Sequence, residues 1–173
     1  MQQPVDHHGA VGVDGAERAP ESSAPVCADA LSHLLRGCGI APTPQRIAVA
    51  AVLLERPQHL SADQILARVR ERQAPAAVGR AARGISKATV YNTLNLFARR
   101  GLVREVIVDP SRVFYDSNTD EHHHVFDMTS GRLWDVAPEQ VRVLGLPDLP
   151  EGVTLEGIDV VVRVRSRPLR ERR

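Results

Sequence analysis

The sequence predicts an α+β fold: a helical N-terminal part that closes with a β-hairpin, followed by a smaller part rich in strands. Apolar residues recur at helical spacing from about residue 27, and a turn sequence at 109–111 separates two strand-like runs. Further strand-like runs lie between residues 125 and 164. The 173 residues, of which 43% are hydrophobic, suffice for one medium domain or two small ones.

The first two helices are marked by their ends. The first begins near Cys27, and Gly37 follows its last apolar residues as a stop signal. Thr43 and Pro44 suit the start of the second helix, because a hydroxyl can accept from a free amide and proline lacks the N–H that would stay unpaired there. Pro57 is expected to end this helix.

Two further helices carry side-chain caps. Ser61 and Gln64 have the spacing of a capping box, in which each side chain pairs with the backbone N–H of the other residue. Ser86 can cap a fourth helix that runs to about Arg100, where Gly101 ends it.

A hairpin is expected directly after the fourth helix. Leu102–Val108 and Arg112–Tyr115 have strand composition, and Asp109-Pro110-Ser111 between them is a turn sequence. Short helices closed by a hairpin are the elements of a winged helix, in which the last helix before the hairpin enters the major groove of DNA.

The C-terminal part is expected to hold a second hairpin, a helix and a strand. Val125–Met128 and Arg132–Val136 would form the hairpin, Pro138–Leu144 the helix, and Leu155–Val164 the strand, the strongest strand prediction in the chain. A unit of this size buries its own faces poorly, so we expect it to dimerise.

Charge is distributed unevenly, although the formal net charge is only +1. No acidic residue occurs from Gln73 to Arg104, a stretch that begins with an Ala/Arg/Gly-rich loop at 73–84, whereas residues 109–135 are predominantly acidic. The first stretch predicts a basic surface for a polyanion, and the second an acidic pocket for cations.

The fourth helix offers a buried and a free face. Val90, Leu94 and Phe97 are spaced for burial, which leaves residues near its N-terminus available to a major groove. Methyl groups suit thymine, an amide suits adenine, and a lysine beside free helix amides suits a phosphate. The candidate DNA contacts are Lys87, Ala88, Thr89, Tyr91 and Asn92, together with Arg46 of the second helix. A solvated amphipathic helix in a protein-binding module is the alternative.

Three consecutive histidines, His122, His123 and His124, lie between an acidic stretch and a strand-like run. Imidazole is the commonest protein ligand for transition metals, and carboxylates add oxygen ligands. Side chains alternate faces in an extended chain, so His122 and His124 point one way and His123 the other. With Asp116 upstream and Asp135 downstream, they predict a mixed nitrogen and oxygen metal site; a solvated loop is the alternative.

Only two cysteines occur, Cys27 and Cys38, and neither lies in a C-x-x-C pair. A disulfide framework and a structural zinc held by four cysteines are therefore not expected. No apolar run approaches the roughly 18 residues of a membrane span, and the N-terminus lacks a secretory pattern. We expect a cytoplasmic protein without a membrane partner.

Several motifs together resemble the ferric uptake regulator family, over about residues 31–165. They are Thr43-Pro44-Gln45-Arg46, His59-Leu60-Ser61-Ala62, Ala88-Thr89-Val90-Tyr91, Gly101-Leu102-Val103 and the histidine cluster followed by Gly131. Phe114-Tyr115-Asp116, the three histidines and Asp159-Val160-Val161-Val162-Arg163 look most similar to the iron response regulator branch.

The resemblance implies a homodimeric transcription factor, not an enzyme, that binds double-stranded promoter DNA. It implies a regulatory Fe²⁺, Mn²⁺ or Zn²⁺ between a winged-helix domain and a small α/β dimerisation domain. The ligands, carried over by position, would be His59, Asp116, His122, His124 and Asp135.

Four regions follow from the resemblance and the predicted elements. Residues 1–26 would be a disordered tail and 166–173 a basic C-terminal tail. Residues 27–117 would form the winged-helix domain with its hinge, and residues 118–165 the dimerisation and metal-sensing domain.

The chain also departs from the family pattern. Asp127 and Ser130 stand where many members have the first cysteine pair of a structural zinc, and there is no second pair. Ile158 stands where a second metal site would pair a histidine with His123. The fold is therefore expected to be stable without that zinc.

Haem and peroxide are alternative signals. Branch members are linked to haem, but Cys38 is followed by glycine and not by the proline of a haem motif, so haem would have to use His122, His123 or His124. Peroxide-sensing relatives have an aspartate where Asp135 stands. The residues are also compatible with a manganese- or zinc-responsive repressor, or with a metalloprotein that does not bind DNA.

Overall fold

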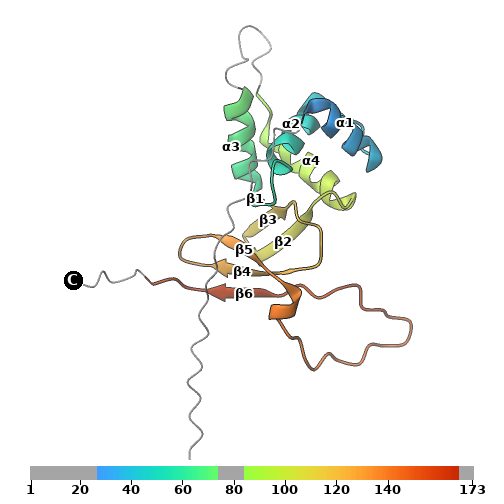
Figure 1. The fold of residues 1–173 in the computed structure, drawn as a ribbon, viewed down its shortest axis with the longest axis vertical. Helices are drawn as coiled ribbons and strands as arrows, with labels where there is room; N and C mark the ends of the chain where they lie inside the picture. Colours follow the sequence, from blue (N-terminus) through green and yellow to red (C-terminus); the bar gives the residue numbers. More distant parts are fainter. Residues whose placement is uncertain (1–26, 74–83, 168–173) are drawn as a thin grey trace, which may run out of the picture.

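The computed structural model describes residues 27–73 and 84–167 and has the expected α+β architecture (Figure 1). The predicted tail at 1–26, most of the loop predicted at 73–84, and the end of the C-terminal tail at 168–173 lie outside the described residues. None of the described helices is long and apolar enough to cross a membrane.

Four helices build the N-terminal part, close to the predicted ranges. They are α1 (Ala28–Gly37), α2 (Pro44–Leu53), α3 (Ala62–Gln73) and α4 (Lys87–Arg99). The predicted caps are formed: Thr43 Oγ1 accepts from the third amide of α2 at 3.3 Å, and Ser86 Oγ accepts from the corresponding amide of α4 at 3.1 Å. Both bonds of the capping box between Ser61 and Gln64 are present. Gly101 ends α4 with a φ of +69°, a backbone conformation that glycine adopts without steric cost.

A three-stranded antiparallel sheet closes the N-terminal part. The predicted hairpin is β2 (Arg104–Asp109) and β3 (Arg112–Asp116), and a third strand, β1 (His59–Ser61), pairs with the other edge of β3. The sequence did not predict β1, because three residues are too few to show an alternating pattern.

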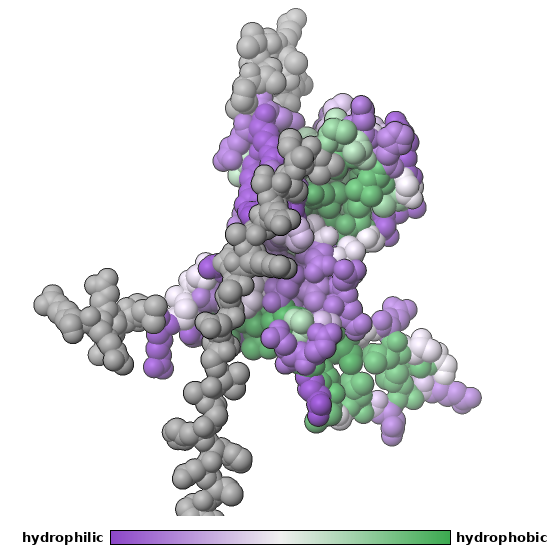
Figure 2. All heavy atoms as spheres, in the orientation of Figure 1, coloured by the Kyte–Doolittle hydropathy of each residue, from purple (hydrophilic) through white to green (hydrophobic). Residues whose placement is uncertain are grey.

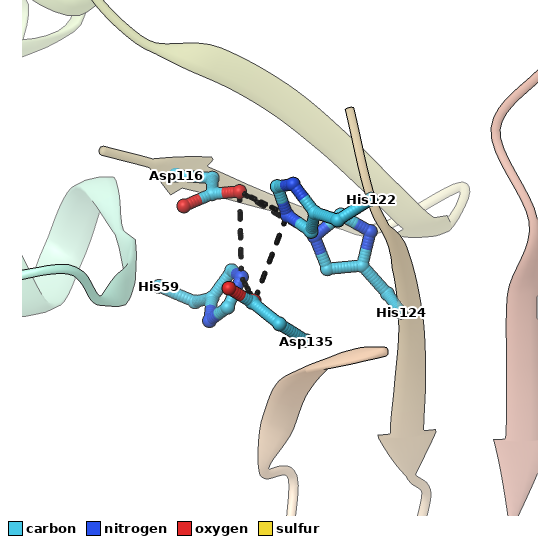
Figure 3. A group of neighbouring side chains, drawn as sticks. All are labelled: His59, Asp116, His122, His124 and Asp135. Atoms are coloured by element: carbon cyan, nitrogen blue, oxygen red, sulfur yellow. Dashed lines mark hydrogen bonds and ion pairs between the residues drawn. The ribbon is translucent and has the colours of Figure 1, made fainter. Parts of the chain in front are cut away.

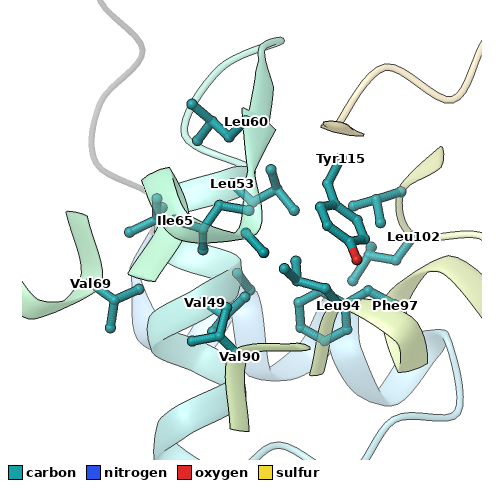
Figure 4. Close-up of a cluster of buried hydrophobic side chains, with 14 of the residues drawn as sticks. Val49, Leu53, Leu60, Ile65, Val69, Val90, Leu94, Phe97, Leu102 and Tyr115 are labelled. Atoms are coloured by element: carbon teal, nitrogen blue, oxygen red, sulfur yellow. The ribbon is translucent and has the colours of Figure 1, made fainter. Parts of the chain in front are cut away.

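The helical core gathers side chains from α2, α3, α4 and the sheet (Figure 4). Leu53, Ile65, Leu94 and Phe97 are fully buried there, and Tyr115 of β3 packs against them. The expected buried face of α4 is thus confirmed.

The C-terminal part is a second three-stranded sheet in the order β5-β4-β6. Its strands are β4 (His123–Asp127), β5 (Leu133–Val136) and β6 (Val161–Val164), with β5 antiparallel and β6 parallel to β4.

Two predictions for the C-terminal part are wrong in extent. The helix expected at Pro138–Leu144 is a single 3₁₀ turn, Pro138–Gln140, which ends at the β-branched Val141 in extended backbone. The strand expected from Leu155 begins only at Val161. It is limited to the residues that pair with β4, and the first of these pairs is Val161 with His124.

The β2–β3 hairpin lies between two hydrophobic clusters, because side chains alternate along a strand. Val113 and Tyr115 pack on the helices, while Phe114 points the other way and packs, together with Val106 and Val108, against Phe126 of β4. The rings of Phe114 and Phe126 are 6.0 Å apart between centroids. The second cluster is completed by Leu133 and Val161, so it joins the N-terminal and C-terminal parts.

Large apolar side chains are exposed on the long segment between β5 and β6 (Figure 2). They are Val143, Leu144, Leu146, Leu149, Val153 and Leu155, and the most exposed is Leu144 at 81%. The prediction that the C-terminal part leaves much of its apolar surface uncovered agrees with this exposure.

Candidate metal centre

Five side chains from separate parts of the chain converge where the two sheets meet (Figure 3). They are His59, Asp116, His122, His124 and Asp135, the five residues that the sequence singled out as ligands. One nitrogen or carboxylate oxygen from each lies within 4.8 Å of every other. Four of the five are buried or nearly so, and Asp135, 37% exposed, forms the open side.

The strand register explains this convergence. His59 of β1 lies directly opposite Asp116 of β3, and His124 of β4 lies directly opposite Asp135 of β5. Opposed residues in an antiparallel pair hold their Cβ atoms about 5 Å apart, so each sheet delivers one histidine–aspartate pair. His122 is adjacent to β4 and shares a side with His124, as expected from strand alternation.

The contacts centre on the three Nε2 atoms and one oxygen of each carboxylate. His59 Nε2 is 2.8 Å from Asp135 Oδ1, and His122 Nε2 is 2.8 Å from Asp116 Oδ2. The Nε2 atoms of His122 and His124 are 3.0 Å apart. Because His59 comes from the helical part and Asp135 from the C-terminal part, the cluster spans both.

Backbone groups and Asn118 hold the outer atoms of these side chains. The Asn118 N–H donates to Asp116 Oδ1 at 2.8 Å, and its side-chain amide donates to Asp135 Oδ2 at 3.1 Å. His122 Nδ1 is 2.7 Å from the Asp120 carbonyl, so a proton on Nδ1 leaves the Nε2 lone pair free. Such outer contacts orient metal ligands.

Sequence reasoning missed Asn118. The available signal was its place two residues after Asp116, the spacing at which an aspartate side chain accepts from a following amide.

The donor set fits a divalent transition metal. Two of its buried atoms, His59 Nε2 and Asp116 Oδ2, have no hydrogen-bond partner, although charged groups surround both. Unpaired buried polar atoms are costly, and a cation shared by three imidazoles and two carboxylates would satisfy them together.

A protonated His59 offsets part of the negative charge of the two carboxylates in the cluster. Burial alone would lower the pKa of His59, but the carboxylates of Asp116 and Asp135 outweigh burial and raise it to about 9. Burial opposes ionisation of Asp116 too, yet His124 and His59 hold the pKa of Asp116 well below its usual range. The pKa of Asp135 is also lowered, against the effect of burial, by His59 and Asn118.

His123 is turned away from the cluster, as alternation predicts. It is 7% exposed, its Nδ1 has no hydrogen-bond partner, and it lines a separate pocket of about 350 Å³ with Val141, Leu155 and Ile158. The three histidines therefore do not act as one unit.

Asp127 and Ser130, which stand where the resemblance places the first cysteine pair of a structural zinc, belong to a hydrogen-bonded turn. Asp127 accepts from the Ser130 hydroxyl at 2.8 Å, from the Thr129 N–H at 2.8 Å and from the Ser166 N–H at 3.2 Å. These bonds tie the β4–β5 turn to the segment after β6. Neither cysteine is close to this turn in the chain, and Cys27 instead caps α1 through its sulfur.

The candidate DNA contacts lie at or near the start of α4. Lys87, Ala88, Tyr91 and Asn92 are exposed and Thr89 is half-buried, its hydroxyl 2.8 Å from that of Ser86. Arg46, in the first turn of α2, is half-buried, and its guanidinium donates to the Ala41 carbonyl at 2.8 Å.

Comparison with known proteins agrees with the sequence motifs. The Ferric uptake regulator family matches residues 38–161. A peroxide-responsive repressor PerR of Staphylococcus aureus is 34% identical over 108 residues, which are 62% of this chain and 67% of that repressor.

Solved structures show the same fold. The ferric uptake regulator of Pseudomonas aeruginosa with manganese has a TM-score of 0.53 and 23% identity, covering 79% of this chain and 97% of that one. The ferric uptake regulator of Francisella tularensis with iron has a TM-score of 0.56 and 17% identity, covering 75% and 93%. With a family match over most of its length, the chain belongs to the ferric uptake regulator family of metal-responsive transcription regulators, which are not enzymes.

Proposed function

We propose that this protein is a transcription regulator whose DNA binding responds to a divalent metal bound by His59, Asp116, His122, His124 and Asp135. The observation that carries the proposal is the convergence of these five donor atoms, two of which are buried without a hydrogen-bond partner. In the metal-free protein a protonated His59 supplies positive charge to the cluster, and the bound metal would take over this role. Mixed imidazole and carboxylate ligands suit Fe²⁺, Mn²⁺ and Zn²⁺.

The response would act through the arrangement of the two parts. His59 belongs to the helical part, and His124 and Asp135 to the C-terminal sheet, so an ion shared by them favours one relative orientation. In a dimer, that orientation sets the spacing of the two α4 helices, and hence their fit to successive major grooves.

The DNA-binding residues in this proposal are Arg46, Lys87, Ala88, Thr89, Tyr91 and Asn92. Support comes from the exposure of most of these residues near the start of α4 and from the absence of acidic residues between 73 and 104. We further propose a division into a DNA-binding domain, 27–117, and a dimerisation domain, 118–165. The apolar side chains exposed between β5 and β6 support a homodimer formed through the second domain.

The test is a titration of metal-free protein with Mn²⁺, Fe²⁺ and Zn²⁺ while its binding to duplexes from its own promoter region is followed. A metal should change DNA affinity for the native protein, and His59→Ala should remove that change. His123→Ala is the matched control, since His123 is buried beside the cluster but outside it. DNA affinity that ignores every metal would refute the proposal.

Peroxide sensing is the second candidate function. The similarity to a peroxide-responsive repressor and the carboxylate of Asp135 at the open side of the cluster favour it. Peroxide would oxidise His59 or His122 when the site holds Fe²⁺. Mass spectrometry should then find one added oxygen atom after peroxide treatment of the Fe²⁺ form and none in the Mn²⁺ form.

A haem-responsive function, as in the iron response regulator branch, rests on the sequence resemblance. His122 and His124 face the carboxylates, so of the three consecutive histidines His123 is the one left for a haem iron. Haem titration of the native protein and of His123→Ala tests this version: an absorbance change common to both excludes His123 as the ligand.

A further inference from the structure

The first residue of the recognition helix is a cation in an unfavourable place. Lys87 opens α4, and the first turn of α4 contains no acidic residue. The N-terminus of a helix carries a partial positive charge, so a lysine there is repelled. The cost is small at an exposed helix end, and a nearby anion would offset it.

The compensating anion comes from another helix. Asp63, in the first turn of α3, places its carboxylate 2.8 Å from Lys87 Nζ. The same ammonium lies 5.6 Å from the centre of the Tyr91 ring, one turn further along α4. Asp63 and Tyr91 line a common cleft of about 540 Å³. The ammonium is thus held between a carboxylate and an aromatic ring on the surface expected to meet DNA.

This ion pair is exposed, with 59% of the Lys87 side chain and 66% of the Asp63 side chain accessible. Exposed pairs add little to stability, so the pair is a weak structural tie between α3 and α4. Its larger effect is on a polyanion: a carboxylate beside the lysine cancels the charge that would otherwise neutralise a phosphate.

We propose that Asp63 is an intramolecular counter-ion of Lys87 that weakens non-sequence-specific DNA binding and directs Lys87 along Tyr91. Asp63 is a positioning residue in this role, and the inference rests on the proposed DNA-reading role of α4. Non-specific affinity comes almost entirely from neutralised phosphates, so a masked lysine lowers it more than it lowers affinity for a site that also offers base contacts.

The salt dependence of DNA binding measures the masking directly. Each phosphate that a protein neutralises adds about −0.9 to the slope of log affinity against log salt concentration. Asp63→Asn should free Lys87 and steepen the slope for random duplex by about 0.9 for each α4 that contacts DNA. Between 50 and 200 mM salt, the affinity ratio of variant to native protein would then change by about 3.5-fold per helix.

A double-mutant cycle assigns the effect to the pair. Lys87→Met should flatten the slope by about 0.9 per helix in the Asp63→Asn background and by much less in the native background. Asp63→Glu, which keeps the charge, should restore the native slope. Melting temperatures of all variants check that the fold is intact.

Glu55→Gln is the matched control. Glu55 pairs with Arg72, which lies near the C-terminal end of α3. Arg72 is nine residues from Asp63, which is about 14 Å along the helix. That distance exceeds the Debye length of about 8 Å at physiological salt, so this substitution should leave the slope unchanged.

Two results would overturn the inference: an Asp63→Asn slope equal to the native slope, or a Lys87→Met change that is equal in both backgrounds. Either leaves the proposed function intact if the native protein still binds its promoter in response to metal. Failure of all variants and the native protein to bind any duplex would refute the proposed function as well.

Discussion

Metal affinity should depend on pH through one identifiable proton, that of His59. In the metal-free protein the pKa of His59 is raised to about 9 by Asp116 and Asp135, against the effect of burial. At pH 7 only about 1% of His59 is then unprotonated, so a metal must displace a proton at a cost of about 3 kcal/mol. The affinity for Mn²⁺ should rise about tenfold between pH 7 and pH 8, and level off above pH 9.

Isothermal titration calorimetry in two buffers of different ionisation enthalpy at pH 7.5 counts the protons released. The native protein should release about one more proton per Mn²⁺ than His59→Gln does. His123→Gln, which changes a buried histidine outside the cluster, should behave as the native protein. Equal proton release from native protein and His59→Gln would refute this account of the cluster.

The same pKa values set the stability of the metal-free protein. Since the folded state raises the pKa of His59, its contribution to the free energy of unfolding is fully present below pH 6.5 and is lost as pH rises towards 9. Asp116 acts in the opposite direction: its lowered pKa stabilises the fold above about pH 4, and this contribution is lost as pH falls further. Metal-free protein should therefore be destabilised at alkaline pH, where metal affinity is highest.

Three further outcomes are expected. Asn118→Ala removes the hydrogen bond to one oxygen of Asp135, while the backbone N–H of residue 118 still donates to Asp116. The affinity for Mn²⁺ should therefore fall about tenfold, and the melting temperature of the metal-free protein should change little. An unchanged affinity would show that Asn118 does not orient the proposed ligands. Phe126→Ala empties the centre of the cluster between the two parts and should lower the free energy of unfolding by about 3–5 kcal/mol in urea denaturation, and a loss below about 1 kcal/mol would contradict the packing. Hydrogen bonds from Ser166, Thr129 and Ser130 keep the pKa of Asp127 below its usual range, so this carboxylate stabilises the fold above about pH 4 and loses that effect in acid. Asp127→Asn should lower the melting temperature at pH 7 and make the melting temperature fall less steeply below about pH 4. An unchanged acid profile would contradict the stabilising role of these hydrogen bonds.

The sequence predicted elements whose signals are local. Helix ends could be read from Thr43, Ser61 and Ser86 because a cap depends on residues three positions away. The alternation of His122, His123 and His124 could be predicted for the same reason, since it depends only on extended backbone.

Features that depend on distant partners were harder to predict. β1 exists because His59 and its neighbours find an open edge of β3, which the sequence around residue 59 does not reveal. The strand expected from Leu155 is shortened to the residues that pair with β4, from Val161 opposite His124 onwards. His59 itself was placed in the cluster by family resemblance, and Asn118 was missed, because its role appears only when Asp116 and Asp135 are brought together.

The β2–β3 hairpin belongs structurally to both parts of the chain. Tyr115 is part of the helical core, whereas Phe114 and Val108 are part of the cluster built on β4. Arg163 of β6 donates to the Val108 carbonyl at 2.7 Å, which adds a polar link on the same side. A fragment cut after residue 117 would keep its helices but carry an uncovered apolar strand face, and should be prone to aggregation. Chimaeras that exchange DNA-binding halves between relatives would have to exchange Phe114 and Phe126 together, since these two rings form one joint between the halves.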